Sequence, residues 1–251
     1  MHAFLVTNFH SKDEPYMTLI LLPNLLHEEA QEALCLPGGL KEVVSRLNGL
    51  IAESPKEGRQ FLKRMGRVPL EVPQKELSEH TTSEEIDRLL DPMKKGETWG
   101  YVSDAGLPCL ADPGAKLVAK ARENKIAVQA ISGPSSIMLV LMLSGLSAQN
   151  FSFLGYLPRD TEELKKALKA MEKRVREEKQ TQVFIETPYR NEKLFQTLVQ
   201  TLSLDLKLCI ASNLTGPDES VETQTIANWK KTSPPPLKDK PAIFAIGLAG
   251  H

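Results

Sequence analysis

Three glycine- and proline-rich turns in the middle of the chain carry the side chains best suited to chemistry. The first turn, residues 103–108, reads Ser-Asp-Ala-Gly-Leu-Pro, the second, residues 111–114, reads Ala-Asp-Pro-Gly, and the third, residues 131–136, reads Ile-Ser-Gly-Pro-Ser-Ser. Each lies between an apolar run and a helix start, which is where open α/β sheets bind ligands. Hydroxyls and exposed main-chain groups can hold a polar cofactor, and a carboxylate can accept a proton. We therefore predict that the turns form an active-site wall.

Three carboxylates are candidates for a chemical role, two in these turns and one further along the chain. Asp104 is the first candidate for a general base, although an aspartate in a turn more often bonds its own main chain. Asp112 precedes Pro113 and is expected to cap a helix rather than to catalyse. Glu186 ends a predicted strand and is a candidate to bind substrate or cofactor. Arg190 is a candidate to pair with Glu186 or with a phosphate, and a structural ion pair between the two is an equal alternative.

Composition argues against a general nucleic-acid-binding surface. The 251 residues are 41% apolar and 25% charged, as in globular proteins, and 31 Lys+Arg against 32 Asp+Glu leave a net charge of −1. An RNA substrate would therefore need a local patch. Tyr156 and Tyr189 can stack on a base or pack against the protein. The lysines of the predicted helix at 160–179 are interspersed with glutamates, which favours a solvated face over an RNA contact.

Metal, disulfide and membrane functions find no support in the sequence. Cys35, Cys109 and Cys209 are widely spaced and lie far from the five histidines, so we expect neither a metal site nor a disulfide. The first ten residues lack the features of a signal peptide. The longest apolar run, residues 137–143, is much shorter than a membrane span. We expect a soluble, cytoplasmic protein.

Strand and helix signals alternate through the first half of the chain. Thr82 and Glu85 match a capping box, and Asp112-Pro113 is expected to place an N-cap and a first-turn proline before the helix at 115–124. This alternation favours a mainly parallel sheet covered on both faces. Strands are expected at residues 17–22, 50–52, 68–72, 98–102 and 126–131, and helices at 40–47, 56–65, 82–96, 115–124 and from the third turn to 143.

The second half has the same character after a small, polar segment at residues 144–150. We therefore predict an N-terminal α/β domain at residues 1–147 and a C-terminal α/β domain at 148–251, with parallel or mixed sheets. Strands are expected at residues 151–156, 182–186, 206–211 and 241–248, and helices at 160–179 and 189–202.

The motifs of Rossmann dinucleotide enzymes, P-loop NTPases and α/β-hydrolases are absent from the sequence. What is present resembles the tetrapyrrole-methylase superfamily, the class III S-adenosylmethionine-dependent methyltransferases. The first two turns are similar to its S-D-A-G-T-P and S-D-P-G, residues 132–136 to P-G-P-S-A, residues 151–158 to F-x-F-x-G-F-L-P, and residues 184–190 to F-Y-E-S-P-H-R. The branch that methylates a ribose 2′-oxygen of 16S ribosomal RNA is the most similar.

This resemblance implies two α/β domains with S-adenosylmethionine in the cleft between them, usually in a homodimer, and rRNA or the small ribosomal subunit as partner. Asp104 would be both the catalytic candidate and a cofactor contact. The full set of implied cofactor-binding residues is Pro23, Ser103, Asp104, Ala105, Leu107, Ser135, Ser136, Glu186 and Ala211.

Three segments depart from the pattern of the rRNA branch. Residues 22–26, 52–58 and 211–216 replace its A-T-P-I-G-N, A-E-D-T-R-x-T and A-R-E-L-T-K. Three hypotheses follow: methylation of rRNA ribose, which leads; methylation of a tetrapyrrole or another small acceptor; and a non-catalytic protein that keeps the cofactor pocket.

Overall fold

A computed structural model describes residues 17–248, so the residues from which a signal peptide was judged lie outside the described part. The described chain forms two compact units. Residues 17–25 and 31–134 make up the first, and residues 26–30 and 135–248 make up the second. The domain boundary predicted at residue 147 stays a prediction.

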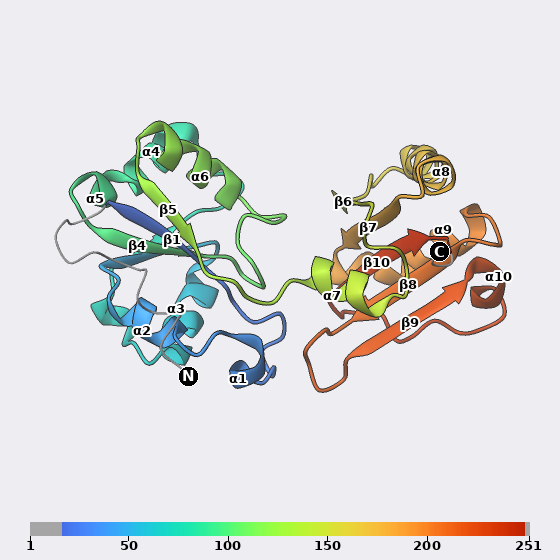
Figure 1. The fold of residues 1–251 in the computed structure, drawn as a ribbon, viewed down its shortest axis with the longest axis horizontal. Coiled ribbons are helices and arrows are strands. Elements are labelled where there is room, and N and C mark those ends of the chain that lie inside the picture. The colour runs from blue at the N-terminus through green and yellow to red at the C-terminus, as the bar shows by residue number, and fades with distance from the viewer. Residues whose placement is uncertain (1–16, 249–251) are drawn as a thin grey trace. The chain divides into compact units, whose positions relative to one another are not determined.

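The first unit is built on a fully parallel five-stranded sheet in the order β3-β2-β4-β1-β5. Parallel strands need helical crossovers, and these cover both faces, with α4 and α6 on one side and α2 and α3 on the other (Figure 1). The α/β fold class predicted from the sequence is confirmed. The strands are β1 (Thr18–Leu22), β2 (Gly49–Ala52), β3 (Gln74–Glu76), β4 (Thr98–Val102) and β5 (Ala127–Ala130).

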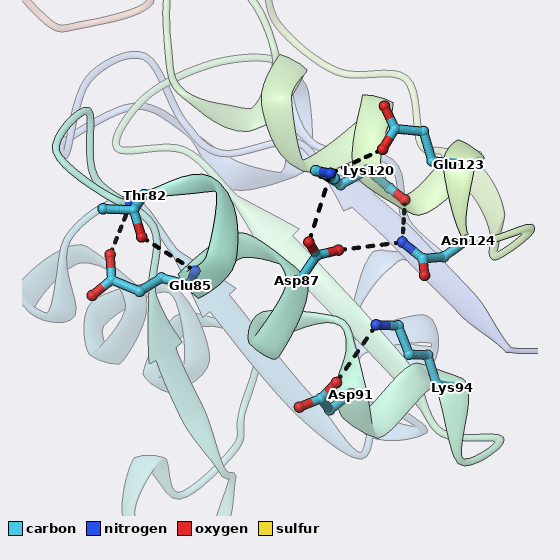
Figure 2. A network of polar contacts seen from close by, with 8 residues as sticks. All are labelled: Thr82, Glu85, Asp87, Asp91, Lys94, Lys120, Glu123 and Asn124. Atoms are coloured by element: carbon cyan, nitrogen blue, oxygen red, sulfur yellow. Dashed lines mark hydrogen bonds and ion pairs between the residues drawn. The ribbon is translucent and has the colours of Figure 1, made fainter.

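Polar contacts fasten the helices of the first unit to one another. The predicted capping box is present at the start of α4, where Thr82 accepts from the Glu85 N–H and the Glu85 carboxylate accepts from the Thr82 N–H. Asp87 of α4 contacts Lys120 and Asn124 at the end of α6 (Figure 2). The helices are α1 (Glu32–Cys35), α2 (Leu40–Ser45), α3 (Pro55–Arg64), α4 (Ser83–Leu89), α5 (Asp91–Lys94) and α6 (Gly114–Glu123).

Two elements predicted for the first unit were wrong, both at prolines. The strand expected at residues 68–72 is instead a 3-10 helix, Pro69–Glu71, and the third strand follows it as β3. The helix expected to run to Gly96 is divided into α4 and α5, because Pro92 has no N–H to give to the carbonyl of Arg88. The Lys75 ammonium donates to that carbonyl instead, at 3.0 Å.

The second unit contains a mixed five-stranded sheet in the order β6-β7-β10-β8-β9. Only β6 and β7 pair in parallel, and the other pairs are antiparallel. The sequence analysis missed β9, whose alternating polar residues carry no apolar signal. The strands are β6 (Phe151–Tyr156), β7 (Thr181–Glu186), β8 (Lys207–Ser212), β9 (Ser220–Thr225) and β10 (Ala242–Gly247).

Helices cover both faces of this sheet as well. The predicted apolar stripe of α8 is confirmed and packs with α9 against one face, whereas α7 packs against the other through Ile137, Val140 and Leu141. The predicted helix at 189–202 begins with a 3-10 turn, Pro188–Arg190. The α-helices are α7 (Ser136–Leu143), α8 (Thr161–Glu177), α9 (Asn191–Thr201) and α10 (Ile226–Trp229).

Residues 17–248 contain neither a membrane-spanning helix nor a metal-binding cluster. No helix in this range is long and apolar enough to cross a bilayer. Nor does the range contain a group of three or more His, Cys, Asp or Glu side chains arranged to hold a metal ion. The three cysteines are free thiols.

Candidate functional site

The turn that follows β4 is held in place by Asn24, which follows β1. The Asn24 side-chain amide donates to the main-chain oxygens of Ser103, at 3.1 Å, and Asp104, at 3.0 Å. The Asn24 main-chain N–H donates to the oxygen of Gly106 at 2.8 Å. Because β1 and β4 are parallel neighbours, their carboxyl ends meet at one edge of the sheet, and the asparagine reaches the turn directly.

Asn24 is itself fully bonded. It is only 2% exposed, and its Oδ1 accepts from the main-chain N–H of Leu25 at 2.9 Å and from Nη1 of Arg64 at 2.8 Å. A buried amide with all its donors used has one orientation. The sequence analysis missed Asn24 and Arg64 as positioning residues. An asparagine placed directly after an apolar strand and a proline was the available signal.

The carboxylate of Asp104 lies at the exposed surface of the turn and has one partner within residues 17–248. Its Oδ1 accepts a hydrogen bond from the Ser54 hydroxyl at 2.8 Å. Ser54 is the N-cap of α3, and its oxygen accepts from the Glu57 N–H at 3.3 Å. One hydroxyl therefore links the end of β2, the start of α3 and the predicted catalytic carboxylate.

Glu53 is a second carboxylate at this edge, one that the sequence analysis did not single out. Its Oε2 accepts from the main-chain N–H of Asp104 at 3.0 Å, and its own N–H donates to the oxygen of Val102 at 3.1 Å. The side chain is half-buried. Burial raises the pKa of Glu53, and the negative charges of Asp104 and Asp112 raise it further, while the Asp104 N–H opposes them.

The same turn presents main-chain groups that a ligand could use. Among the residues the structure describes, the N–H groups of Ala105 and Leu107 have no hydrogen-bond partner, and Ala105 is exposed. The Ser103 hydroxyl is different, since it is 2% exposed and donates to the Ala105 oxygen at 3.2 Å. Free amide donors beside two carboxylates suit a polar ligand with both hydroxyl and carboxylate groups.

The prediction that Asp112 is the N-cap of α6 was wrong, although its side chain does bond the start of this helix. The N-cap of α6 is Pro113, not Asp112, and the helix starts at Gly114. Asp112 Oδ1 accepts from the Gly114 N–H at 2.7 Å and from the Tyr101 hydroxyl at 2.8 Å. Burial raises the pKa of Tyr101 far above its ordinary value, and the negative charge of Asp112 raises it further. The hydrogen bonds of Asp112 and Tyr101 therefore hold the second turn in place.

The third turn lies against Pro23, the first of the predicted cofactor residues. A Cβ added to Gly133 would lie 2.1 Å from the Cβ of Pro23, so only glycine permits this approach. Ile131, which precedes the turn, donates its N–H to the oxygen of Leu21 at 3.0 Å. The structure therefore brings Pro23, the first turn and residues 131–134 of the third turn to one edge of the first sheet.

The other four predicted cofactor residues belong to the second unit. Ser135 is the N-cap of α7, is 7% exposed and makes no side-chain capping bond, and Ser136 begins the helix. Ala211 is fully buried in β8. Glu186 ends β7, where its side chain is 3% exposed and pairs with Arg190 at 3.2 Å. The strand β10 lies between β7 and β8, so Glu186 and Ala211 are not neighbours.

Comparison with known proteins shows the family to which the chain belongs. The family model described as tetrapyrrole (corrin/porphyrin) methylases matches residues 36–229. The protein named ribosomal RNA small subunit methyltransferase I is 32% identical in Halalkalibacterium halodurans, over 61% of this chain and 53% of that protein. The Bacillus subtilis protein of the same name is 29% identical over 76% of this chain and 65% of that protein. The matches thus span about half to two thirds of these relatives.

Solved structures share the fold at low identity. The methyltransferase CobJ superposes with a TM-score of 0.62 and 11% identity, covering 92% of this chain and 93% of CobJ. The uroporphyrin-III-C-methyltransferase from Thermus thermophilus superposes with a TM-score of 0.52 and 15% identity, covering 92% of each chain. The family predicted from the turn motifs is therefore confirmed: this chain belongs to the tetrapyrrole (corrin/porphyrin) methylase family.

Proposed function

We propose that this protein is an S-adenosylmethionine-dependent methyltransferase that acts on a ribose 2′-oxygen of small-subunit ribosomal RNA. The observation that carries the proposal is the turn at residues 103–108, held by Asn24 and flanked by the carboxylates of Glu53 and Asp104. The family and the names of the relatives support the methyltransferase class and the rRNA substrate.

The first-unit residues fit the cofactor that the family implies. We infer that the free N–H groups of Ala105 and Leu107 and the carboxylate of Asp104 would bind its polar groups, with Pro23 and Ser103 shaping the wall. Ser135, Ser136, Glu186 and Ala211 stay in the proposed set. S-adenosylmethionine supplies an electrophilic methyl group on a sulfonium, a good leaving group, so no metal or covalent enzyme nucleophile is needed.

The protein's remaining task is to position the acceptor and remove its proton. Holding reactants about 3–3.5 Å apart can supply roughly 7–11 kcal/mol of barrier reduction. A ribose hydroxyl is a weak nucleophile, so a base would add about 10²–10⁴-fold. Asp104 is the base predicted from the sequence, and Glu53, half-buried with a raised pKa, is the alternative that the structure adds.

A tetrapyrrole or another small acceptor is the second candidate. The net charge of −1 favours it, because a protein without excess positive charge attracts RNA weakly. An electron-rich tetrapyrrole carbon attacks without prior deprotonation, so under this candidate neither carboxylate would serve as a base. A non-catalytic cofactor-binding protein is the third candidate, because the segments at residues 22–26 and 52–58 depart from the rRNA branch. Cytoplasmic location and a homodimer are part of the proposal as well.

Two measurements test the function. Calorimetry with S-adenosylmethionine and S-adenosylhomocysteine, with ATP and NAD as controls, should show selective binding near one site per chain. A ribose-methylation profile of rRNA from cells with and without the protein should differ at a defined position. Cofactor binding with an unchanged profile would exclude rRNA and favour a small acceptor or a binding role.

A further inference from the structure

Two tyrosines are exposed at the carboxyl end of the only parallel strand pair in the described part of the second sheet. Tyr156, the last residue of β6, is 58% exposed, and Tyr189, in the 3-10 turn after β7, is 69% exposed. The strand register pairs Tyr156 with Ile185, one residue before the end of β7. Both segments therefore leave the sheet at the same edge, each carrying an aromatic ring in contact with water.

The segment that carries Tyr189 is fastened on both sides of the ring. Glu186 Oε1 accepts from the Thr187 N–H at 2.8 Å and from the Thr187 hydroxyl at 3.2 Å, while its Oε2 pairs with Arg190 at 3.2 Å. The carboxylate is buried. Because these bonds already order the residues on both sides of Tyr189, binding does not carry the free-energy cost of ordering this segment.

Positive charge accompanies the two rings. Arg159 follows Tyr156 by three residues and Lys193 follows Tyr189 by four; both are exposed, and neither forms an ion pair with any residue in the range 17–248. Asp160 is occupied as the N-cap of α8. Both cations are thus close to an exposed aromatic ring in the sequence and have no ion-pair partner in the described range. Aromatic rings and positive charge together are the combination by which proteins bind single-stranded nucleic acid.

We propose that Tyr156 and Tyr189, with Arg159 and Lys193, form a surface on which unpaired bases of the RNA substrate stack. This inference rests on the proposed rRNA function and adds to it the structural class of the target, an unpaired segment. The faces of paired bases are covered by their neighbours in a duplex, whereas those of unpaired bases are open to an aromatic side chain. Two cations contribute about two phosphate contacts, so the salt dependence of binding should be shallow, with a slope near −1.4.

The test uses the full-length protein and a 12-nucleotide single-stranded RNA of mixed sequence, compared with the same sequence as a duplex. Binding is measured by fluorescence anisotropy. Tyr189→Ala should weaken single-strand binding about 5- to 140-fold, which corresponds to the loss of one stacked base at tenfold per 1.4 kcal/mol. Tyr189→Phe should bind like the unchanged protein. Phe151→Ala, at the opposite end of β6 and 37% exposed, is the matched control and should change binding little.

Thermal unfolding and S-adenosylmethionine binding of each variant show whether it folds. Folded Tyr189→Ala that binds the single strand as tightly as the unchanged protein would overturn the stacking surface while leaving the rRNA function in place. Equal affinity of the unchanged protein for single strand and duplex would also overturn it. Failure of the proposed function is a separate result: the unchanged protein then leaves the rRNA methylation profile untouched, and the RNA-stacking surface falls with it.

Discussion

The carboxylate of Glu53 accepts a hydrogen bond from the main-chain N–H of Asp104, with 3.0 Å between Oε2 and N. This bond joins the residue after β2 to the turn after β4, two segments separated by about fifty residues of sequence. It also places two carboxylates with different surroundings at one edge of the sheet. Glu53 is half-buried and Asp104 is exposed.

Glu53→Gln should leave the protein folded and stable. Burial raises the pKa of Glu53, so its ionised form is the less stable one in the folded state. Its stabilising contribution is complete below its ordinary pKa of 4.5 and is lost as the pH rises through the raised folded value. At neutral pH the glutamine variant should therefore be at least as stable as the unchanged protein, as measured by urea unfolding.

The pH dependence of the rate separates a base from a structural group. If Glu53 takes the proton, the rate of the unchanged protein rises with pH through a value above 4.5, and Glu53→Gln removes this step with a loss of about 10²–10⁴-fold. If Glu53→Gln keeps the full rate and the same rise of rate with pH, another group takes the proton.

Asp104→Asn tests the base predicted from the sequence. Asparagine keeps an oxygen that can accept from Ser54, so the turn should stay intact while proton transfer is lost. Single-turnover methylation should fall about 10²–10⁴-fold if Asp104 is the base. Ser54→Ala is the matched control, because it removes the hydrogen bond and keeps the carboxylate. If Asp104→Asn turns over at the normal rate, Asp104 is not the base, and only its proposed contact with the cofactor remains.

Asn24→Ala should destabilise the protein by about 1–3 kcal/mol for each buried group left without a partner, because the oxygens of Ser103 and Asp104 and the Arg64 guanidinium lose the same side chain. Affinity for S-adenosylmethionine should fall with it. Urea unfolding and calorimetry check the two effects. The exposed Asn228 in α10 offers a control, and Asn228→Ala should stay within about 0.5 kcal/mol of the unchanged protein.

Gly133→Ala should force the third turn away from Pro23. The added Cβ would lie 2.1 Å from the proline Cβ, an overlap that costs about 1–3 kcal/mol when the surroundings shift. Gly38→Ala is the control, because the corresponding Cβ meets no atom within 4 Å. Equal thermal-unfolding midpoints for the two variants would show that the third turn can shift away from Pro23 without loss of stability.

Much of the fold and the family followed from the sequence by itself. The apolar runs at β1, β2 and β4, the capping box at Thr82 and the stripe of α8 are local patterns, and each produced the expected element. The three turn motifs were sufficient to predict the family, because tight turns require particular residue types at particular positions. Local patterns failed at Pro69 and Pro92, where proline lacks a main-chain N–H. They also failed at the polar β9, which forms by antiparallel pairing with β8.

Tertiary structure alone decided which side chains meet. Asn24, Glu53 and Asp104 are far apart along the chain, and they come together because parallel strands bring their carboxyl ends to one edge of the sheet. Arg64 reaches Asn24 from the end of α3. No local pattern shows that Asn24 is buried or that Glu53 faces the Asp104 amide. The raised pKa of Glu53 and the buried Glu186–Arg190 pair likewise depend on surroundings that exist only after the strands have packed. Composition and spacing determine the elements, whereas solvent exclusion and strand order determine the site.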